Sequence, residues 1–101
     1  MLDDFSELAQ KDLKKLKREH FRLFQTERVK LLEALDSYEK NLAPADLPKK
    51  FRVKKLKYSE DFWAMTWSFS GPDGRAIFYF EEFENETRLI WVRIGDHGIF
   101  K

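Results

Sequence analysis

The feature that most constrains the fold of this chain is a pair of β-rich runs near its C-terminal end. The first run covers residues 75–83 and the second covers residues 88–94, and a short polar linker separates them. Isoleucine, valine and aromatic side chains suit a pleated, half-buried surface, and the linker is too short for the crossover that parallel strands need. The two runs are therefore predicted to form an antiparallel pair on which the rest of the chain packs.

Two further strands are predicted upstream of this pair. Residues 49–57 contain six basic residues and no acid, which indicates either an edge strand kept soluble by lysines or a phosphate-binding ridge. Residues 62–70 have aromatic side chains on both alternating faces, as a central strand would. The Gly-Pro-Asp-Gly sequence of residues 71–74 is a turn signal that joins this strand to the next one as a hairpin. The sequence thus predicts about four antiparallel strands.

Two helices are predicted before the strands. Asp4 and Glu7 have the spacing of a helix N-cap and its capping box, and apolar residues then recur at helical spacing up to Leu16. A second helical pattern runs from about Phe21 to Asn41, and Pro44 ends it because proline removes a backbone donor. An antiparallel helical hairpin would bury the apolar stripes of both helices. The side chains expected in the core include Leu13, Leu16, Leu35, Phe78 and Trp91.

Taken together, these elements predict an α+β fold in one domain over residues 1–101, with a two-helix hairpin packed on a twisted antiparallel sheet of about four strands. The sequence has no apolar run of about 18 residues, and its first residues lack the basic and apolar segments of a secretory signal. We therefore expect a cytoplasmic protein without membrane contact. Because the chain has no cysteine, it has neither a thiolate nucleophile nor the ligands of a thiolate zinc site.

The formal net charge of +1 hides an asymmetry between the two halves of the chain. Residues 1–57 contain fifteen Lys or Arg and ten Asp or Glu, whereas residues 58–101 contain four and eight. The first part therefore has a charge of +5 and the second part a charge of −4. A local basic surface says more about binding partners than the nearly neutral total does.

The order of these parts resembles that of a known toxin family. The segments that carry the resemblance are Lys11–Lys17, Lys54–Lys57, the aromatic strand with Trp63 and Trp67, Arg75–Tyr79, and the terminal Arg93–Lys101. Over nearly the whole chain, this order is similar to the RelE/YoeB/YafQ superfamily of toxins from type II toxin–antitoxin systems. The resemblance implies a small ribosome-associated endoribonuclease that cleaves messenger RNA and is held inactive by a cognate antitoxin. Members usually begin with a strand, whereas only Met1 and Leu2 precede the helical pattern here.

Metal-independent RNA cleavage needs a proton acceptor, a proton donor and cations that stabilise the charged phosphorane. The resemblance assigns His97 to proton transfer, Arg75 to the scissile phosphate and Lys54 to electrostatic stabilisation. Structural alternatives remain open at this point, because His97 could bond to the backbone of its own turn and Arg75 could pair with Asp73 or Glu82. No metal or cofactor is expected.

Further residues are candidates for contact with RNA. The basic candidates are Arg52, Lys55, Lys57, Arg93 and Lys101, and the three tryptophans either stack on bases or fill the core. Two other functions are compatible with the same features. The chain could be a non-catalytic module that binds nucleic acid or protein, or it could resemble the gyrase-targeting relatives within the same superfamily.

Overall fold

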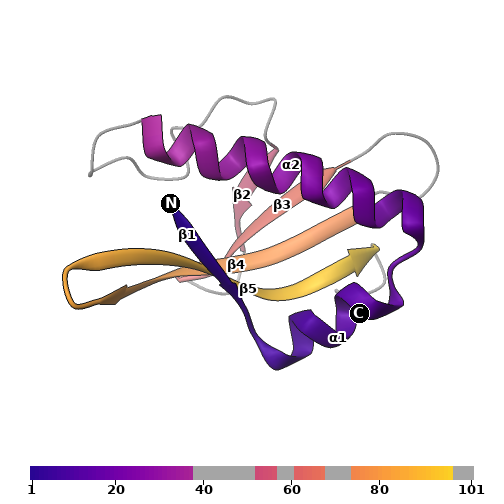
Figure 1. Ribbon diagram of the computed structural model, residues 1–101, viewed down its shortest axis with the longest axis horizontal. Coiled ribbons are helices and arrows are strands. Elements are labelled where there is room, and N and C mark those ends of the chain that lie inside the picture. Colours follow the sequence, from indigo (N-terminus) through magenta and orange to yellow (C-terminus); the bar gives the residue numbers. More distant parts are fainter. Residues whose placement is uncertain (38–51, 57–60, 68–73, 97–101) are drawn as a thin grey trace.

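A computed structural model of the chain describes residues 1–37, 52–56, 61–67 and 74–96 (Figure 1). Within these residues, two helices accompany one five-stranded sheet with the strand order β1-β5-β4-β3-β2. In chain order the elements are β1 (Leu2–Phe5), α1 (Glu7–Lys15), α2 (Arg18–Ser37), β2 (Val53–Lys55), β3 (Trp63–Trp67), β4 (Gly74–Phe83) and β5 (Glu86–Asp96). The α+β class is confirmed.

The sheet is mixed, which corrects the prediction of a four-stranded antiparallel sheet. Strands β2 to β5 form the expected antiparallel meander, but β1 adds a fifth strand that is parallel to β5. This first strand was missed because Asp3 and Asp4 lie in it, and aspartate is depleted in strands. Both carboxylates have cationic partners, since Asp3 binds Arg28 and Asp4 lies 3.5 Å from Arg88.

Helix α1 begins two residues later than predicted, after β1 rather than in place of it. Its N-cap is Ser6, which has extended backbone angles and accepts a hydrogen bond from Ala9 N at 3.1 Å. An N-cap hydroxyl satisfies one of the backbone donors that the first helical turn leaves free. The predicted role of Asp4 as N-cap was therefore wrong.

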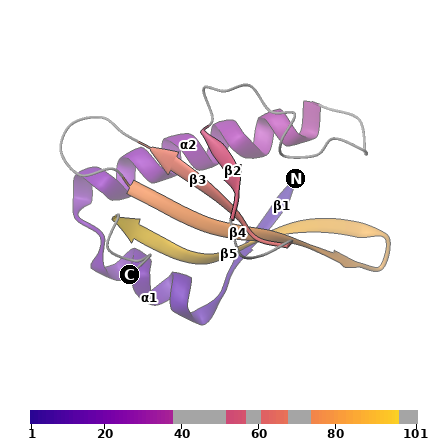
Figure 2. The same ribbon diagram turned by 180° about the vertical axis from the view of Figure 1, so that it is seen from behind.

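The helices do not form the predicted hairpin. Helix α1 lies along β5, whereas α2 crosses one face of the sheet, and the two helices are apart in both views (Figures 1 and 2). The reason is that β1 and α1 both pack alongside β5 at the edge of the sheet. Only α2 is then left to cover the sheet face. No helix among the described residues is both long enough and apolar enough to cross a membrane.

The core lies between α2 and the sheet. Phe24 on α2 is fully buried, and its ring packs 5.1 Å from that of Trp91 and 5.4 Å from that of Trp67. Among the predicted core residues, Leu35, Phe78 and Trp91 are buried, whereas Leu13 and Leu16 are only partly buried against the core. These two leucines belong to the segment at the sheet edge, which explains their lower burial.

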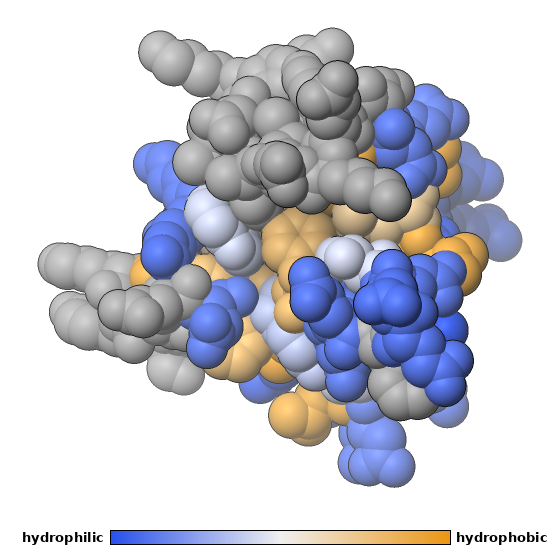
Figure 3. Space-filling view, turned by 90° about the vertical axis from the view of Figure 1, so that its left-hand side faces the viewer, coloured by the Kyte–Doolittle hydropathy of each residue, from blue (hydrophilic) through white to orange (hydrophobic). Residues whose placement is uncertain are grey.

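The β4–β5 hairpin extends beyond the strands on either side of it. Pairing of β4 with β3 ends at Phe78, and pairing of β5 with β1 begins at Arg88, whose partner on β4 is Glu81, so residues 82–87 form a two-stranded ribbon. Its turn residues Glu84 and Asn85 have φ values of 50° and 66°, as expected for the turn whose twist matches a hairpin. Figure 3 looks onto the end of the molecule from which the hairpin projects and shows hydrophilic residues gathered beside a smaller apolar area.

Candidate nucleic-acid interface

The candidate site is the face of the sheet opposite α2. Ala76 and Phe78 of β4 are buried on the side of α2, and side chains alternate along a strand. Arg75, Ile77 and Tyr79 therefore face the other way. Figure 2 shows this face in front, with α2 behind the strands.

The strand register brings three predicted basic residues onto this face. One row across the sheet pairs Lys54 with Ala64, Ala64 with Ile77, and Ile77 with Arg93. The neighbouring row contains Arg75, which is paired with Thr66 on one side and Gly95 on the other. Paired strands are about 4.8 Å apart, so the row from β2 to β5 spans roughly 14 Å. Cations from three strands thus surround a floor of small and apolar residues.

A β-bulge places Arg93 on this face. Phe78 pairs with Trp91, but the preceding residue Ile77 pairs with Arg93, so Val92 is the extra residue of β5. In a regular strand Trp91 and Arg93 would lie on the same face, since their positions differ by two. The bulge reverses the alternation. As a result, Trp91 and Ile94 are buried beside α2, while Arg93 faces the candidate site.

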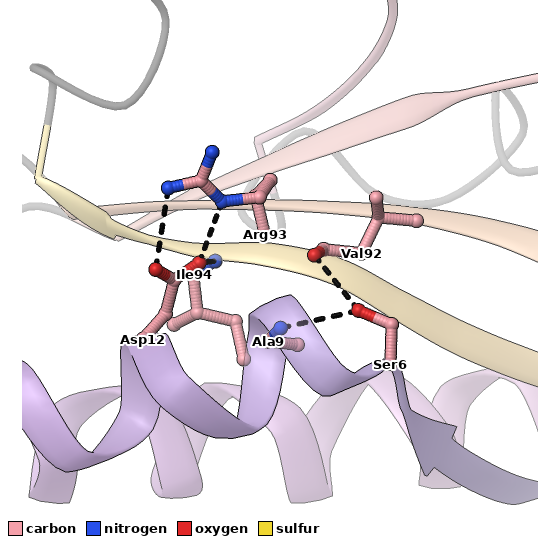
Figure 4. Close-up of polar contacts among 6 residues, drawn as sticks. All are labelled: Ser6, Ala9, Asp12, Val92, Arg93 and Ile94. Atoms are coloured by element: carbon pink, nitrogen blue, oxygen red, sulfur yellow. Dashed lines mark hydrogen bonds and ion pairs between the residues drawn. The ribbon is translucent and has the colours of Figure 1, made fainter.

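Helix α1 supplies an acidic partner for Arg93 (Figure 4). Asp12 Oδ2 accepts from Arg93 Nε at 2.8 Å and Asp12 Oδ1 accepts from Arg93 Nη2 at 3.2 Å. The backbone N–H of Ile94 also donates to Asp12 Oδ2, at 3.0 Å. The hydrogen bonds that Arg93 donates to Asp12, and in addition the negative charge of Asp12, raise the pKa of the Arg93 guanidinium above its usual value. Arg93 is therefore a permanently charged group held in a fixed orientation.

The same helix covers the free edge of β5 beyond the last β1 residue. Ser6 N donates to the carbonyl of Trp91 at 2.9 Å, and Ser6 Oγ donates to the carbonyl of Val92 at 3.0 Å. Together with Asp12, these groups satisfy backbone atoms that an edge strand would leave exposed. The contacts of Ser6 attach the N-terminal end of α1 to the edge of the sheet.

The remaining predicted site residues are only partly brought together. Lys54 is exposed on β2 and Arg75 is half-buried on β4. Lys55 belongs to the opposite face, where its Nζ lies 5.9 Å from the centre of the Trp63 ring, so it does not share the face of Lys54. Arg52 is exposed beside β2, and its carbonyl accepts from Thr66 N. The other candidates, His97, Lys57 and Lys101, lie outside the described residues.

The fold also bears on the alternatives that the sequence left open for Arg75 and for the tryptophans. Glu82 belongs to the other alternating set of β4, so it does not share a face with Arg75, while Asp73 lies outside the described residues. Trp67 and Trp91 are buried and Trp63 is partly buried. The first two are core residues rather than stacking platforms. Within the described parts of the chain, no group of three His, Asp or Glu side chains is placed to hold a metal ion.

Three residues of the site were not singled out from the sequence. Thr66 and Tyr79 face the site, and the ring of Tyr79 packs edge-on against that of Phe62 at 5.6 Å. Counting by twos from Arg75 could have identified Tyr79. Asp12 offered no comparable signal, because its partner lies 81 residues away in the sequence.

A second basic surface lies at the junction of α1 and α2. Its exposed members are Lys11, Lys14, Lys15, Lys17, Arg18 and Arg22, and we call it the junction surface. Lys11, Lys14 and Lys15 lie on one side of α1 because residues three and four apart are neighbours on a helix. In the part of the chain that the structure describes, none of the six is paired with an acidic side chain.

Comparison with known proteins leaves the chemistry of the site as the guide to function. No protein-family model matches the sequence, and no curated protein or solved structure matches it significantly. The site offers the guanidinium of Arg93, which Asp12 holds, the half-buried guanidinium of Arg75, the exposed ammonium group of Lys54, a threonine and a tyrosine. Guanidinium groups suit the geometry of phosphate oxygens, so the arrangement is chemically suited to an RNA or DNA backbone.

Proposed function

We propose that this chain is the toxin of a type II toxin–antitoxin system with a RelE-like fold. In this proposal it acts in the cytoplasm as a metal-independent endoribonuclease that cleaves messenger RNA on the ribosome, and a cognate antitoxin neutralises it. The observation that carries the proposal is the shared sheet face of Lys54, Arg75 and Arg93. These residues come from three strands, and the family resemblance assigns two of them, Lys54 and Arg75, to catalysis.

The chemistry of RNA cleavage gives each of these groups a task. Arg75 and Arg93 bind the non-bridging oxygens of the scissile phosphate, and their charge is most useful when the phosphorane adds negative charge. Lys54, at the open end of the row, adds positive charge without needing to lose its proton. His97 transfers the proton in this proposal, an assignment that rests on the family resemblance.

The first strand gives further support. Members of the family that the sequence resembles usually begin with a strand before the first helix, and β1 occupies that place. The sequence pattern alone indicated that this strand was missing. The order of elements is therefore closer to the family outline than the sequence suggested.

The direct test is cleavage of ribosome-bound messenger RNA by the purified protein. Replacing Arg75 with alanine should lower the rate by roughly 10²–10³, as loss of one donor at an oxyanion site does. His97→Gln should lower it by roughly 10²–10⁴, as loss of a general acid or base does. Lys30→Ala is a matched control, because Lys30 is a 59% exposed cation on α2. Thermal stability and antitoxin binding should stay nearly constant in all three variants.

The test has clear contrary outcomes. Wild-type cleavage rates in both site variants would remove the catalytic assignment, and a large fall in stability would mean that the residue is structural. Induced expression without antitoxin should also stop growth and reduce translation. Normal growth with confirmed folded protein would count against a toxin.

One observation favours a second candidate, a binding module that does not cleave RNA. The charge of Arg93 is already balanced by Asp12, which forms hydrogen bonds to two of its nitrogens. A balanced arginine adds less to phosphorane stabilisation than one with no acidic partner. The same purified protein separates the two functions, because a binding module would retain RNA on the sheet face and release no product.

A further inference from the structure

We infer that Asp12 is a positioning residue that holds Arg93 for contact with the scissile phosphate. The inference rests on the proposed function and adds to it a residue from α1 that no motif identified. Asp12 does not share the site face with the three cations. It acts through Arg93 alone, from the edge of the sheet.

The geometry of the pair leaves one edge of the guanidinium available. Asp12 accepts from Nε and Nη2 of Arg93, and these two nitrogens form one edge of the planar group. In Figure 4 the third nitrogen, Nη1, is directed away from Asp12. An arginine presents two such edges to oxygen pairs. The edge formed by Nη1 and Nη2 can therefore bind a phosphate while Asp12 holds the other edge.

The surroundings of Asp12 make it a rigid support. Its side chain is only 11% exposed, whereas that of Arg93 is 36% exposed. The N–H of Ile94 fixes the carboxylate from the backbone side. An arginine that is oriented in advance loses less side-chain freedom when it binds phosphate.

This arrangement predicts opposite effects of Asp12 on affinity and on catalysis. Removing the carboxylate adds one net positive charge to the site, which strengthens the electrostatic attraction of RNA. It also frees the Arg93 side chain, and misplacement of a catalytic contact by about 1 Å can cost on the order of 10²-fold in rate. A residue that only stabilised the fold would not raise affinity while lowering the rate.

The experiment compares Asp12→Ala with Ser6→Ala, Arg93→Ala and the double variant Asp12→Ala/Arg93→Ala. Affinity is measured for a short single-stranded RNA over a series of salt concentrations, and cleavage is measured on ribosome-bound messenger RNA. Ser6→Ala is the matched control, since it removes another contact of α1 with β5 but leaves Arg93 and its carboxylate unchanged. Asp12→Asn serves if the alanine variant does not fold, because the amide keeps one oxygen acceptor.

Asp12→Ala should lower the cleavage rate on the order of 10²-fold, with RNA affinity above that of the wild type. The double variant should cleave no more slowly than Arg93→Ala, because Asp12 acts only through Arg93. Cleavage by Asp12→Ala at the wild-type rate overturns the inference, and so does an equal loss in Ser6→Ala. A wild-type protein that cleaves no RNA overturns the proposed function and the role of Asp12 with it, so the two failures are distinguishable.

Discussion

Asp3 connects the first strand, the long helix and the centre of the sheet through one carboxylate. Its Oδ1 accepts from Arg28 Nη2 at 2.7 Å, and its Oδ2 accepts from Trp91 Nε1 at 2.8 Å. The Asp3 side chain is 7% exposed and that of Arg28 is 25% exposed. A charge buried to this extent needs its partners, since desolvation without them is costly. The hydrogen bonds also give the buried Trp91 indole its acceptor.

The first prediction is that replacing Asp3 with asparagine destabilises the fold. The loss should be about 2–3 kcal/mol, below the 3–5 kcal/mol of a fully buried pair because Arg28 is partly exposed. Chemical denaturation of the variant measures this change. Arg88→Ala, which removes the exposed partner of Asp4, is the control and should cost less than about 1 kcal/mol. Equal losses in the two variants would contradict the prediction.

The second prediction concerns acid stability. Burial alone would raise the pKa of the Asp3 carboxyl, but the hydrogen bonds from Arg28 and Trp91 and the charge of Arg28 together lower it below its usual 3.8. The ionised Asp3 carboxylate therefore contributes fully to the stability of the fold when the pH is above the usual pKa. This contribution is lost as the pH falls through the lower pKa of the folded state. Below about pH 4, the wild type should lose stability more steeply than Asp3→Asn. Parallel pH profiles of unfolding free energy would count against it.

The third prediction concerns Gly74, at the start of β4. A Cβ atom on this residue would lie 1.8 Å from Cε2 of the buried Trp67 indole. Gly74→Ala should therefore destabilise the protein by about 1–3 kcal/mol, which is typical of an overpacked core. Trp67→Phe in the same background removes the atoms that clash and should recover part of the loss. No recovery in the double variant would show that another contact sets the cost.

At the scale of elements, α1 is attached to the sheet through its N-cap. Ser6 Oγ both accepts from Ala9 N and donates to the carbonyl of Val92. The fourth prediction is that Ser6→Ala costs about 2 kcal/mol, of which about 1 is the lost cap and about 1 the lost hydrogen bond. Ser6→Thr keeps the hydroxyl and should remain near the wild-type stability. Equal denaturation midpoints for the two variants would refute the dual role.

The sequence predicts some elements better than others. The difference depends on whether an element is formed by neighbouring residues or by residues that are far apart in the sequence. The hairpin of β4 and β5 follows from local composition and a short linker, so its antiparallel pairing was predictable. The β1 strand depends on two residues from distant parts of the chain. Arg28 neutralises the charge of Asp3, and Trp91 donates a hydrogen bond to it. A local pattern of two aspartates instead indicates a helix start.

The candidate site was predictable to a similar, partial extent. Lys54 and Arg75 alternate regularly with core residues along their strands. Antiparallel pairing of the strands therefore places both side chains on the same face of the sheet. Arg93 reaches that face only because Val92 is the extra residue of a β-bulge. The sequence of this strand contains no signal that predicts a bulge. The pairing of Arg93 with Asp12 depends in turn on where α1 packs, which the predicted helical hairpin placed elsewhere.

At the scale of the whole molecule, the described charges separate along the longest axis. The junction surface lies at one end, and the β4–β5 hairpin with its exposed Glu81, Glu82, Glu84 and Glu86 lies at the other (Figure 1). A polyanion such as RNA is therefore attracted to one end and repelled from the other, despite a net charge of only +1. In the proposed function, such a distribution would orient the molecule before the sheet face contacts RNA.

The fifth prediction is that the position of a cation, rather than the net charge, decides RNA affinity. Lys14→Ala/Lys15→Ala removes two charges from the junction surface, while Lys30→Ala/Lys55→Ala removes two charges elsewhere. If the junction surface contacts RNA phosphates, the first variant should lower the slope of log affinity against log salt by up to about 1.4, since each single-strand phosphate contact contributes about 0.7. The second variant has the same net charge and should keep a slope close to that of the wild type. Binding to a short single-stranded RNA over a salt series measures both slopes, and equal reductions in the two variants would mean that the net charge alone attracts RNA.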